Sequence, residues 1–139
     1  MNLRPYFLPA ATGAALIASS TIAVAEKDAY SDRAAEKLGK ALAGRTAGQP
    51  VSCIGNMRGS DMTVVDDYTI LFREGGTLYV QKPRGGCYGI GNGNYTLVTR
   101  LHGSNRLCSG QIGEIVDRVS GYGFGSCVFG DFVPYRKAS

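Results

Sequence analysis

The chain has 139 residues and a formal net charge of +4, with 15 Lys and Arg residues against 11 Asp and Glu. Basic and acidic residues are interleaved and form no basic stripe or arm, so we expect no nucleic-acid partner. The length predicts one small domain with its own core.

The first 25 residues are typical of a secretory signal peptide. Arg4 is their only charge, residues 10–24 are small and apolar, and Ala23-Val24-Ala25 has the small-x-small form of a cleavage site. A membrane anchor is the alternative, but the apolar run is shorter than the roughly 20 residues that span a bilayer. We therefore expect cleavage before Glu26, a mature chain without a membrane span, and a periplasmic or secreted location.

Residues 26–50 are predicted to form a helical arm followed by a linker. Apolar side chains recur at spacings of three and four and so share one helix face: Ala34, Ala35, Leu38, Ala41 and Leu42. Because most of this face is alanine, the helix either docks weakly on the domain or projects from it. Residues 45–50 are turn formers and are expected to be the linker.

The clearest β pattern lies in residues 63–82. Residues 68–72 and 77–80 are rich in β-branched, aromatic and aliphatic side chains, and Gly75 and Gly76 between them allow a tight reversal. This combination predicts a β-hairpin. Asp66 and Asp67 supply turn chemistry just before the first strand.

Residues 51–139 as a whole predict a disulfide-linked β domain. The other β-type segments are 51–54, 62–65, 95–101, 112–119 and 127–133. Residues 120–126 are expected to be a flexible turn or bulge, and Pro134 is expected to end the last strand. The predicted fold class is mainly β, a small antiparallel barrel or sandwich with one N-terminal helix, and more specifically an SH3-like or OB-like barrel.

Four cysteines follow the leader: Cys53, Cys87, Cys108 and Cys127. An even number in an exported chain predicts two disulfides. A metal site is the alternative, but the cysteines are widely spaced and one histidine could add a single ligand, so we expect no metal or cofactor. If the first and last strands are adjacent in a barrel, the pairing is Cys53–Cys127 with Cys87–Cys108; the other two pairings stay open.

Catalytic chemistry finds little support in the sequence. His102, the single histidine, lies beside no nucleophile motif. Asp66 and Asp67 are adjacent, so their side chains would diverge in an extended segment, and Glu114 and Asp117 would lie on opposite faces of a strand. We expect no catalytic residue, with an envelope enzyme using a carboxylate such as Asp66 or Glu114 as the alternative.

Aromatic residues beside the glycine loops are the candidate binding residues. Tyr88, Tyr122 and Phe124 lie in such loops, where tyrosine-type side chains make recognition surfaces. The alternative is that these rings fill the core of a domain that has no tryptophan. We expect a monomeric, non-enzymatic binding or structural protein whose partner is a protein or cell-envelope component; a small-ligand carrier is a further alternative.

Six short motifs lie in order along the chain around the cysteines. The motifs are Val51-Ser-Cys-Ile54, Val65-Asp-Asp-Tyr-Thr-Ile-Leu71, Leu78-Tyr-Val80, Gly86-Cys87, Arg106-Leu-Cys108 and Cys127-Val-Phe-Gly-Asp-Phe132. Together, over residues 43–135, they resemble a family of small exported four-cysteine domains of unknown function from sphingomonad-type proteobacteria. The glycine-rich segments around Gly89 and Gly121 depart from the family pattern in being longer and looser. The resemblance implies a stable exported bacterial disulfide domain and carries over no functional residue.

Overall fold

A computed structural model describes residues 21–55, 61–101 and 103–139 of the chain. Within these ranges the chain forms one α-helix and ten short strands, and the strands make three antiparallel sheets. The predicted mainly β fold with one N-terminal helix is confirmed. The predicted barrel is wrong for the described strands, because the largest sheet is open and has a different strand, β1 or β3, at each edge.

The largest sheet has the strand order β1-β10-β5-β4-β3. Its strands are β1 (Arg45–Ala47), β10 (Phe132–Lys137), β5 (Thr77–Gln81), β4 (Thr69–Glu74) and β3 (Met62–Asp66). The predicted hairpin is confirmed as β4 and β5, and Gly75 in its turn has a φ of 57°. The turn before β4 is also confirmed, because the Asp66 carboxylate accepts a hydrogen bond from the Tyr68 backbone N–H at 2.8 Å.

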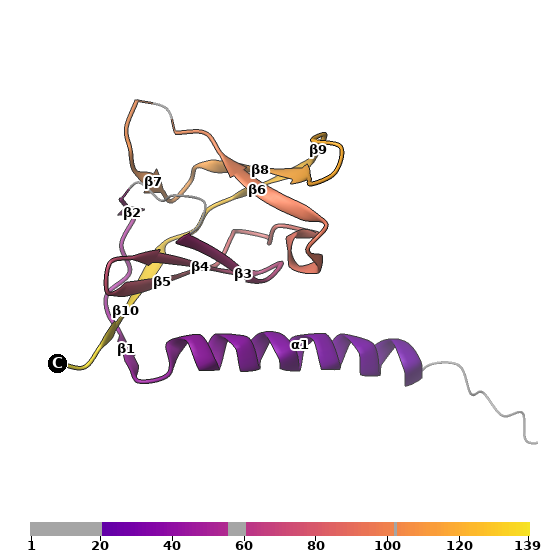
Figure 1. Cartoon of the computed structure of the whole chain (residues 1–139), viewed down its shortest axis with the longest axis horizontal. Helices are drawn as coiled ribbons and strands as arrows, with labels where there is room; N and C mark the ends of the chain where they lie inside the picture. Colours follow the sequence, from indigo (N-terminus) through magenta and orange to yellow (C-terminus); the bar gives the residue numbers. More distant parts are fainter. Residues whose placement is uncertain (1–20, 56–60, 102) are drawn as a thin grey trace, which may run out of the picture.

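Helix α1 (Thr21–Leu42) covers one face of this sheet. Strand alternation turns Leu71, Leu78 and Val80 toward the helix. From the helix, Ala34 is buried in the same cluster, with Leu38, Ala41 and Leu42 packed against it. The C-terminal part of the helix therefore docks, while its N-terminal end extends past the sheet (Figure 1). The predicted leader lies outside the described residues up to residue 20, and its last five residues belong to α1.

The opposite face of the large sheet packs against the rest of the domain, so the fold has three layers (Figure 1). The remaining strands are β2 (Cys53–Ile54), β6 (Tyr95–Thr99), β7 (Leu107–Cys108), β8 (Ile112–Asp117) and β9 (Gly123–Val128). A short 3-10 helix, η2 (Ile90–Asn92), precedes β6. Strands β6, β8 and β9 form one sheet, and β2 and β7 form another. The main core lies between the layers, where Phe72 meets the rings of Phe129 and Phe132 edge-on at 6.3 and 5.8 Å.

Two element boundaries differ from the prediction at the start and end of the β domain. Residues 45–47, expected to be linker, form edge strand β1 against β10. Pro134 does not end the last strand, because β10 continues to Lys137. The Pro134 carbonyl accepts a hydrogen bond from the Gly48 N–H, so the Pro134 nitrogen faces the β1 side of the strand. Because β1 ends at Ala47, no strand pairing on that side requires an N–H from residue 134.

The segments around Phe124 and Phe129 also differ from the prediction. Residues 123–126, expected to be part of a flexible turn or bulge, belong to β9, and the register shift between β8 and β9 makes a bulge there. The segment predicted as one strand over 127–133 is divided, because β9 ends at Val128 and β10 begins at Phe132. Phe129 lies in the break between them and is fully buried, so this aromatic side chain fills the core from outside any strand.

The disulfides are Cys53–Cys108 and Cys87–Cys127, so two bridges are confirmed and the predicted pairing is wrong. The first strand does meet the last one, but through Val51 and Phe132. Cys53 lies beyond that contact, opposite Cys108 in the β2–β7 pair. Arg84 and Val128 form an isolated antiparallel β-bridge, that is, a backbone pairing outside the strands. It brings the loop that contains Cys87 to the end of β9. Two disulfides indicate an oxidising, extracytoplasmic environment.

Candidate aromatic binding site

The loop between β5 and β6 contains Tyr88 and is fixed at several points. Cys87 is bonded to Cys127 and donates its backbone N–H to the Asp67 carbonyl at 2.7 Å. The Asp67 carboxylate accepts from the Gly91 N–H at 2.8 Å, and Ile90 is buried in the core. The loop is therefore held on the domain by a disulfide, hydrogen bonds and a core side chain.

Tyr68 and Tyr88 form an aromatic pair on one side of this loop. Their ring centroids are 6.2 Å apart in an edge-to-face arrangement, and the Tyr68 hydroxyl donates to that of Tyr88 at 3.3 Å. This hydrogen bond raises the pKa of Tyr68 above its usual 10.0, and the charge of Asp67 nearby adds to the increase. Gly86 lies so close that a Cβ there would be 2.6 Å from the Tyr68 ring.

Tyr95 and Phe124 form a second aromatic pair beside the same loop. Their rings are stacked, with centroids 4.3 Å apart and planes inclined by 28°. A register shift between β8 and β9 leaves Phe124 as the additional residue of a bulge. Gly89 lies against both rings, because a Cβ there would be 3.0 Å from Tyr95 and 3.6 Å from Phe124.

We call the four residues Tyr68, Tyr88, Tyr95 and Phe124 the aromatic surface. Tyr68, Tyr88 and Phe124 keep 51%, 65% and 57% of their areas exposed, and Tyr95 is half-buried. Such exposure of large rings that are held against a rigid loop is typical of recognition surfaces. The arrangement can bind a partner by ring stacking and by hydrogen bonds to tyrosine hydroxyls.

The three sequence-predicted binding residues are all exposed, and their binding role stays a prediction. Tyr88 and Phe124 belong to the aromatic surface; Tyr122 is 79% exposed two residues before Phe124, at the entry to β9. Sequence reasoning missed Tyr68 and Tyr95 as partners of these rings. Their position beside Gly86 and Gly89 is visible only once the chain is folded.

The carboxylates considered for catalysis have structural contacts. Asp66 holds the turn before β4, and Glu114 forms an ion pair with Arg100 at 3.3 Å. Asp117 accepts hydrogen bonds from Ser120 and from the Val119 N–H in the turn after β8. Those hydrogen bonds, chiefly from Ser120, lower the pKa of Asp117 below its usual 3.8. Each of these carboxylates therefore takes part in a turn or an ion pair.

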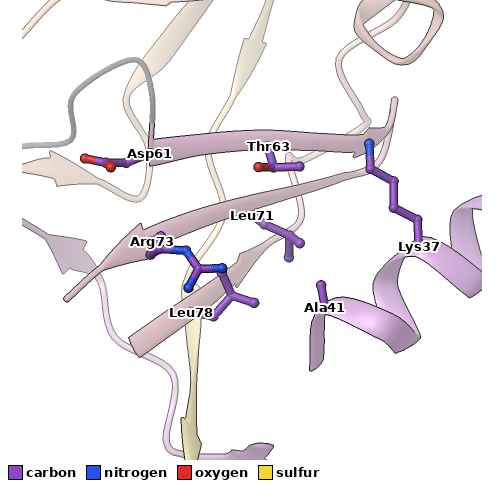
Figure 2. Close-up of a pocket in the computed structure, with 7 residues that line it drawn as sticks. All are labelled: Lys37, Ala41, Asp61, Thr63, Leu71, Arg73 and Leu78. Carbon is purple, nitrogen blue, oxygen red and sulfur yellow. The ribbon is translucent and has the colours of Figure 1, made fainter. Parts of the chain in front are cut away.

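A hollow of about 270 Å³ lies between α1 and the large sheet (Figure 2). Ala41, Leu71 and Leu78 form its apolar part. Figure 2 shows Lys37 extending from the helix toward β3 and Arg73 lying close to Leu78. Among the described lining residues Asp61 is the one carboxylate, so the hollow has no carboxylate pair.

No cluster of metal-binding side chains is found in the part of the chain that the structure describes. His102, the single histidine, lies outside that part. Within the described ranges, no helix has both the length and the apolar character needed to cross a membrane. Comparison of the chain with family models, curated proteins and solved structures gives no match.

Proposed function

We propose that this protein is a non-enzymatic binding domain of the periplasm or of the secreted fraction, delivered by its signal peptide. Its recognition site is the aromatic surface, and its partner is a protein or another component of the cell envelope. The domain acts as a monomer. The resemblance to exported four-cysteine domains remains a proposal alongside it.

The observation that carries this proposal is the fixation of exposed aromatic rings against glycines of a disulfide-anchored loop. Gly86 allows the approach of Tyr68, and Gly89 allows that of Tyr95 and Phe124. Rings that are already ordered lose little conformational entropy on binding, which favours affinity. The two disulfides and the leader-like N-terminus support an extracytoplasmic location.

Cross-linking followed by affinity recovery from an envelope fraction tests the proposal. The wild-type chain is expected to recover a specific partner, and a variant with Tyr122→Ala and Phe124→Ala is expected to lose it. Loss of an aromatic residue at the centre of an interface costs about 2 kcal/mol or more, which corresponds to roughly 30-fold weaker binding. Recovery by the double variant at the wild-type level would contradict the proposal.

A matched control comes from the sheet of β6, β8 and β9, which also contains Phe124. Val98 and Ile112 are 38% and 61% exposed, on β6 and β8, and belong to no aromatic pair. A variant with Val98→Ala and Ile112→Ala therefore removes exposed apolar area away from the aromatic surface. It is expected to recover the partner like the wild type, while urea unfolding of both double variants verifies that each is folded.

A further inference from the structure

A groove of about 410 Å³ lies beside the aromatic surface, where α1, β3, η2 and β6 approach one another. Its volume is within the roughly 300–1,000 Å³ of small-molecule sites. Met62, Val64, Ile90 and Tyr95 provide apolar lining. Tyr95 is shared with the aromatic surface, but the groove does not depend on that surface having a partner.

The charged lining of this groove has one sign. Lys37 from the helix and Arg118 from the turn after β8 both line it, and none of the described lining residues is acidic. Neither cation takes part in an ion pair among the residues that the structure describes. Two cations from distant parts of the sequence therefore line one groove. Asp61 shares the adjoining hollow with Lys37 but does not line the groove, whose positive lining favours an anionic ligand.

Both cations are positioned by backbone contacts that leave donors available. The Lys37 ammonium donates to the Val64 carbonyl, on the edge strand that lines the groove. An ammonium has three donor hydrogens, so two remain for a ligand. The Arg118 N–H donates to the Asn94 carbonyl at 3.0 Å, which fixes the backbone of Arg118 beside the start of β6. Among the described residues its guanidinium takes part in no ion pair, and it can make paired hydrogen bonds to an anion.

The nearby carboxylates are not among the residues that line the groove, although Asp67 is hydrogen-bonded to the lining residue Gly91. Asp67 accepts from the Gly91 N–H, and Asp117 accepts from Val119 and Ser120. They are thus held by the loops that shape the groove. The lining also includes Thr63 and Thr96, whose hydroxyls can donate to an anionic oxygen.

We propose that this groove binds a small organic anion. A phosphate or carboxylate group is held by Lys37 and Arg118, and the apolar part of the ligand packs against Met62, Val64 and Tyr95. The proposal requires both features of the ligand, because the groove joins a cationic rim to an apolar lining.

Isothermal titration with three probes tests the proposal on the full domain. Hexyl phosphate has both features, inorganic phosphate has the charge alone, and hexanol has the apolar chain alone. Hexyl phosphate is expected to bind about tenfold or more tighter than either of the other probes. Its affinity is expected to fall as salt is raised, since charge-assisted contacts are screened.

Substitution of each cation separates its contribution. Lys37→Gln and Arg118→Gln are each expected to weaken hexyl phosphate about tenfold or more. Lys40→Gln on the same helix, where Lys40 is ion-paired with Glu36, and Arg136→Gln on β10 are controls expected to bind like the wild type. Because Lys37 also contacts β3, Arg118→Gln decides the outcome if Lys37→Gln loosens the helix.

A vesicle arm identifies the source of the anion. The anion is a membrane headgroup if the protein sediments with phosphatidylglycerol vesicles but not with phosphatidylcholine vesicles, and if Arg118→Gln loses this sedimentation. The ligand is soluble if hexyl phosphate binds and the protein does not sediment with vesicles. The proposal is overturned if neither hexyl phosphate nor phosphatidylglycerol vesicles bind, if hexanol and hexyl phosphate bind equally, or if Arg118→Gln keeps the wild-type affinity. Tyr88→Ala removes a ring of the aromatic surface that does not line the groove, and it should still bind hexyl phosphate while losing the partner of the proposed function, so the two tests fail independently.

Discussion

Tyr95 and Phe124 stack with ring centroids 4.3 Å apart, although their strands are not neighbours in the sheet. Strand β8 lies between β6 and β9, so the two rings meet across it. The bulge at Phe124 and the close approach of Gly89 make this contact possible. The pair therefore links the three-stranded sheet to the loop that contains Tyr88.

Replacing Gly89 by Ala is expected to destabilise the domain more than the same change at Gly93. Both glycines have positive φ, 91° and 82°, so each substitution costs about 1–2 kcal/mol of backbone strain. A Cβ at Gly89 also presses on the Tyr95 ring, whereas a Cβ at Gly93 meets nothing within 4 Å. Urea unfolding should give losses of about 2–4 and 1–2 kcal/mol, respectively. Equal losses would show that Tyr95 does not pack against the loop.

Peptide mapping without reduction is expected to recover Cys53 linked to Cys108, and Cys87 linked to Cys127. Each bridge closes a long loop, with sequence separations of 55 and 40, and chain entropy assigns about 4 kcal/mol to each. Replacing Cys87 and Cys127 by Ala should cost more than replacing the other pair, because both are buried in the core. A peptide linking Cys53 to Cys127 would refute the architecture of the core.

Replacing Gln81 by Met is expected to stabilise the protein. Gln81 is fully buried, and within the described residues neither atom of its amide has a hydrogen-bond partner from the protein. It lies opposite Ile70 and Phe132, so a methionine of similar length finds apolar neighbours. Thermal and urea unfolding should show a gain of about 1–3 kcal/mol. Gln49→Met, at an exposed position, is the control with little effect, and a loss of stability in Gln81→Met would contradict the account.

The Asp117 turn is expected to lose its stabilising charge in acid. Hydrogen bonds from Ser120 and Val119 lower the pKa of Asp117 in the folded chain, so its contribution is present above its usual pKa of 3.8, which it has in the unfolded chain. It is lost as the pH falls through the lower folded pKa. Asp117→Asn, which keeps the shape without the charge, should be less stable than the wild type at pH 6 and nearly equal below the folded pKa. An unchanged difference across this range would contradict the assignment.

Local sequence patterns predicted the elements whose cause is local. The strands β4 and β5 follow from β-forming side chains on either side of Gly75 and Gly76, and the turn before them follows from Asp66. The helix was also predicted, and its docking through Ala34 was one of two outcomes left open. Neighbouring residues determine the strands, the turn and the helix, whereas the docking of the helix depends on the distant sheet.

The features that could not be predicted from the sequence depend on contacts between distant segments. The disulfide pairing is set by the β2–β7 pair and by the contact of Arg84 with Val128, neither of which has a local pattern. Pro134 continues a strand because its nitrogen faces the side on which β1 has ended. Of the aromatic surface, only Tyr88 and Phe124 were predicted. Tyr68 and Tyr95 pair with these two rings only because the fold brings distant segments together.

Site-specific photo-cross-linking in the envelope tests the aromatic binding surface most directly. A photoreactive phenylalanine in place of Tyr88 is expected to form an adduct with one partner, and the same group in place of Ile112 is expected to form none. Both positions are about equally exposed, at 65% and 61%, so accessibility alone would label them alike. Equal adducts from both positions, or adducts from Ile112 alone, would contradict the account.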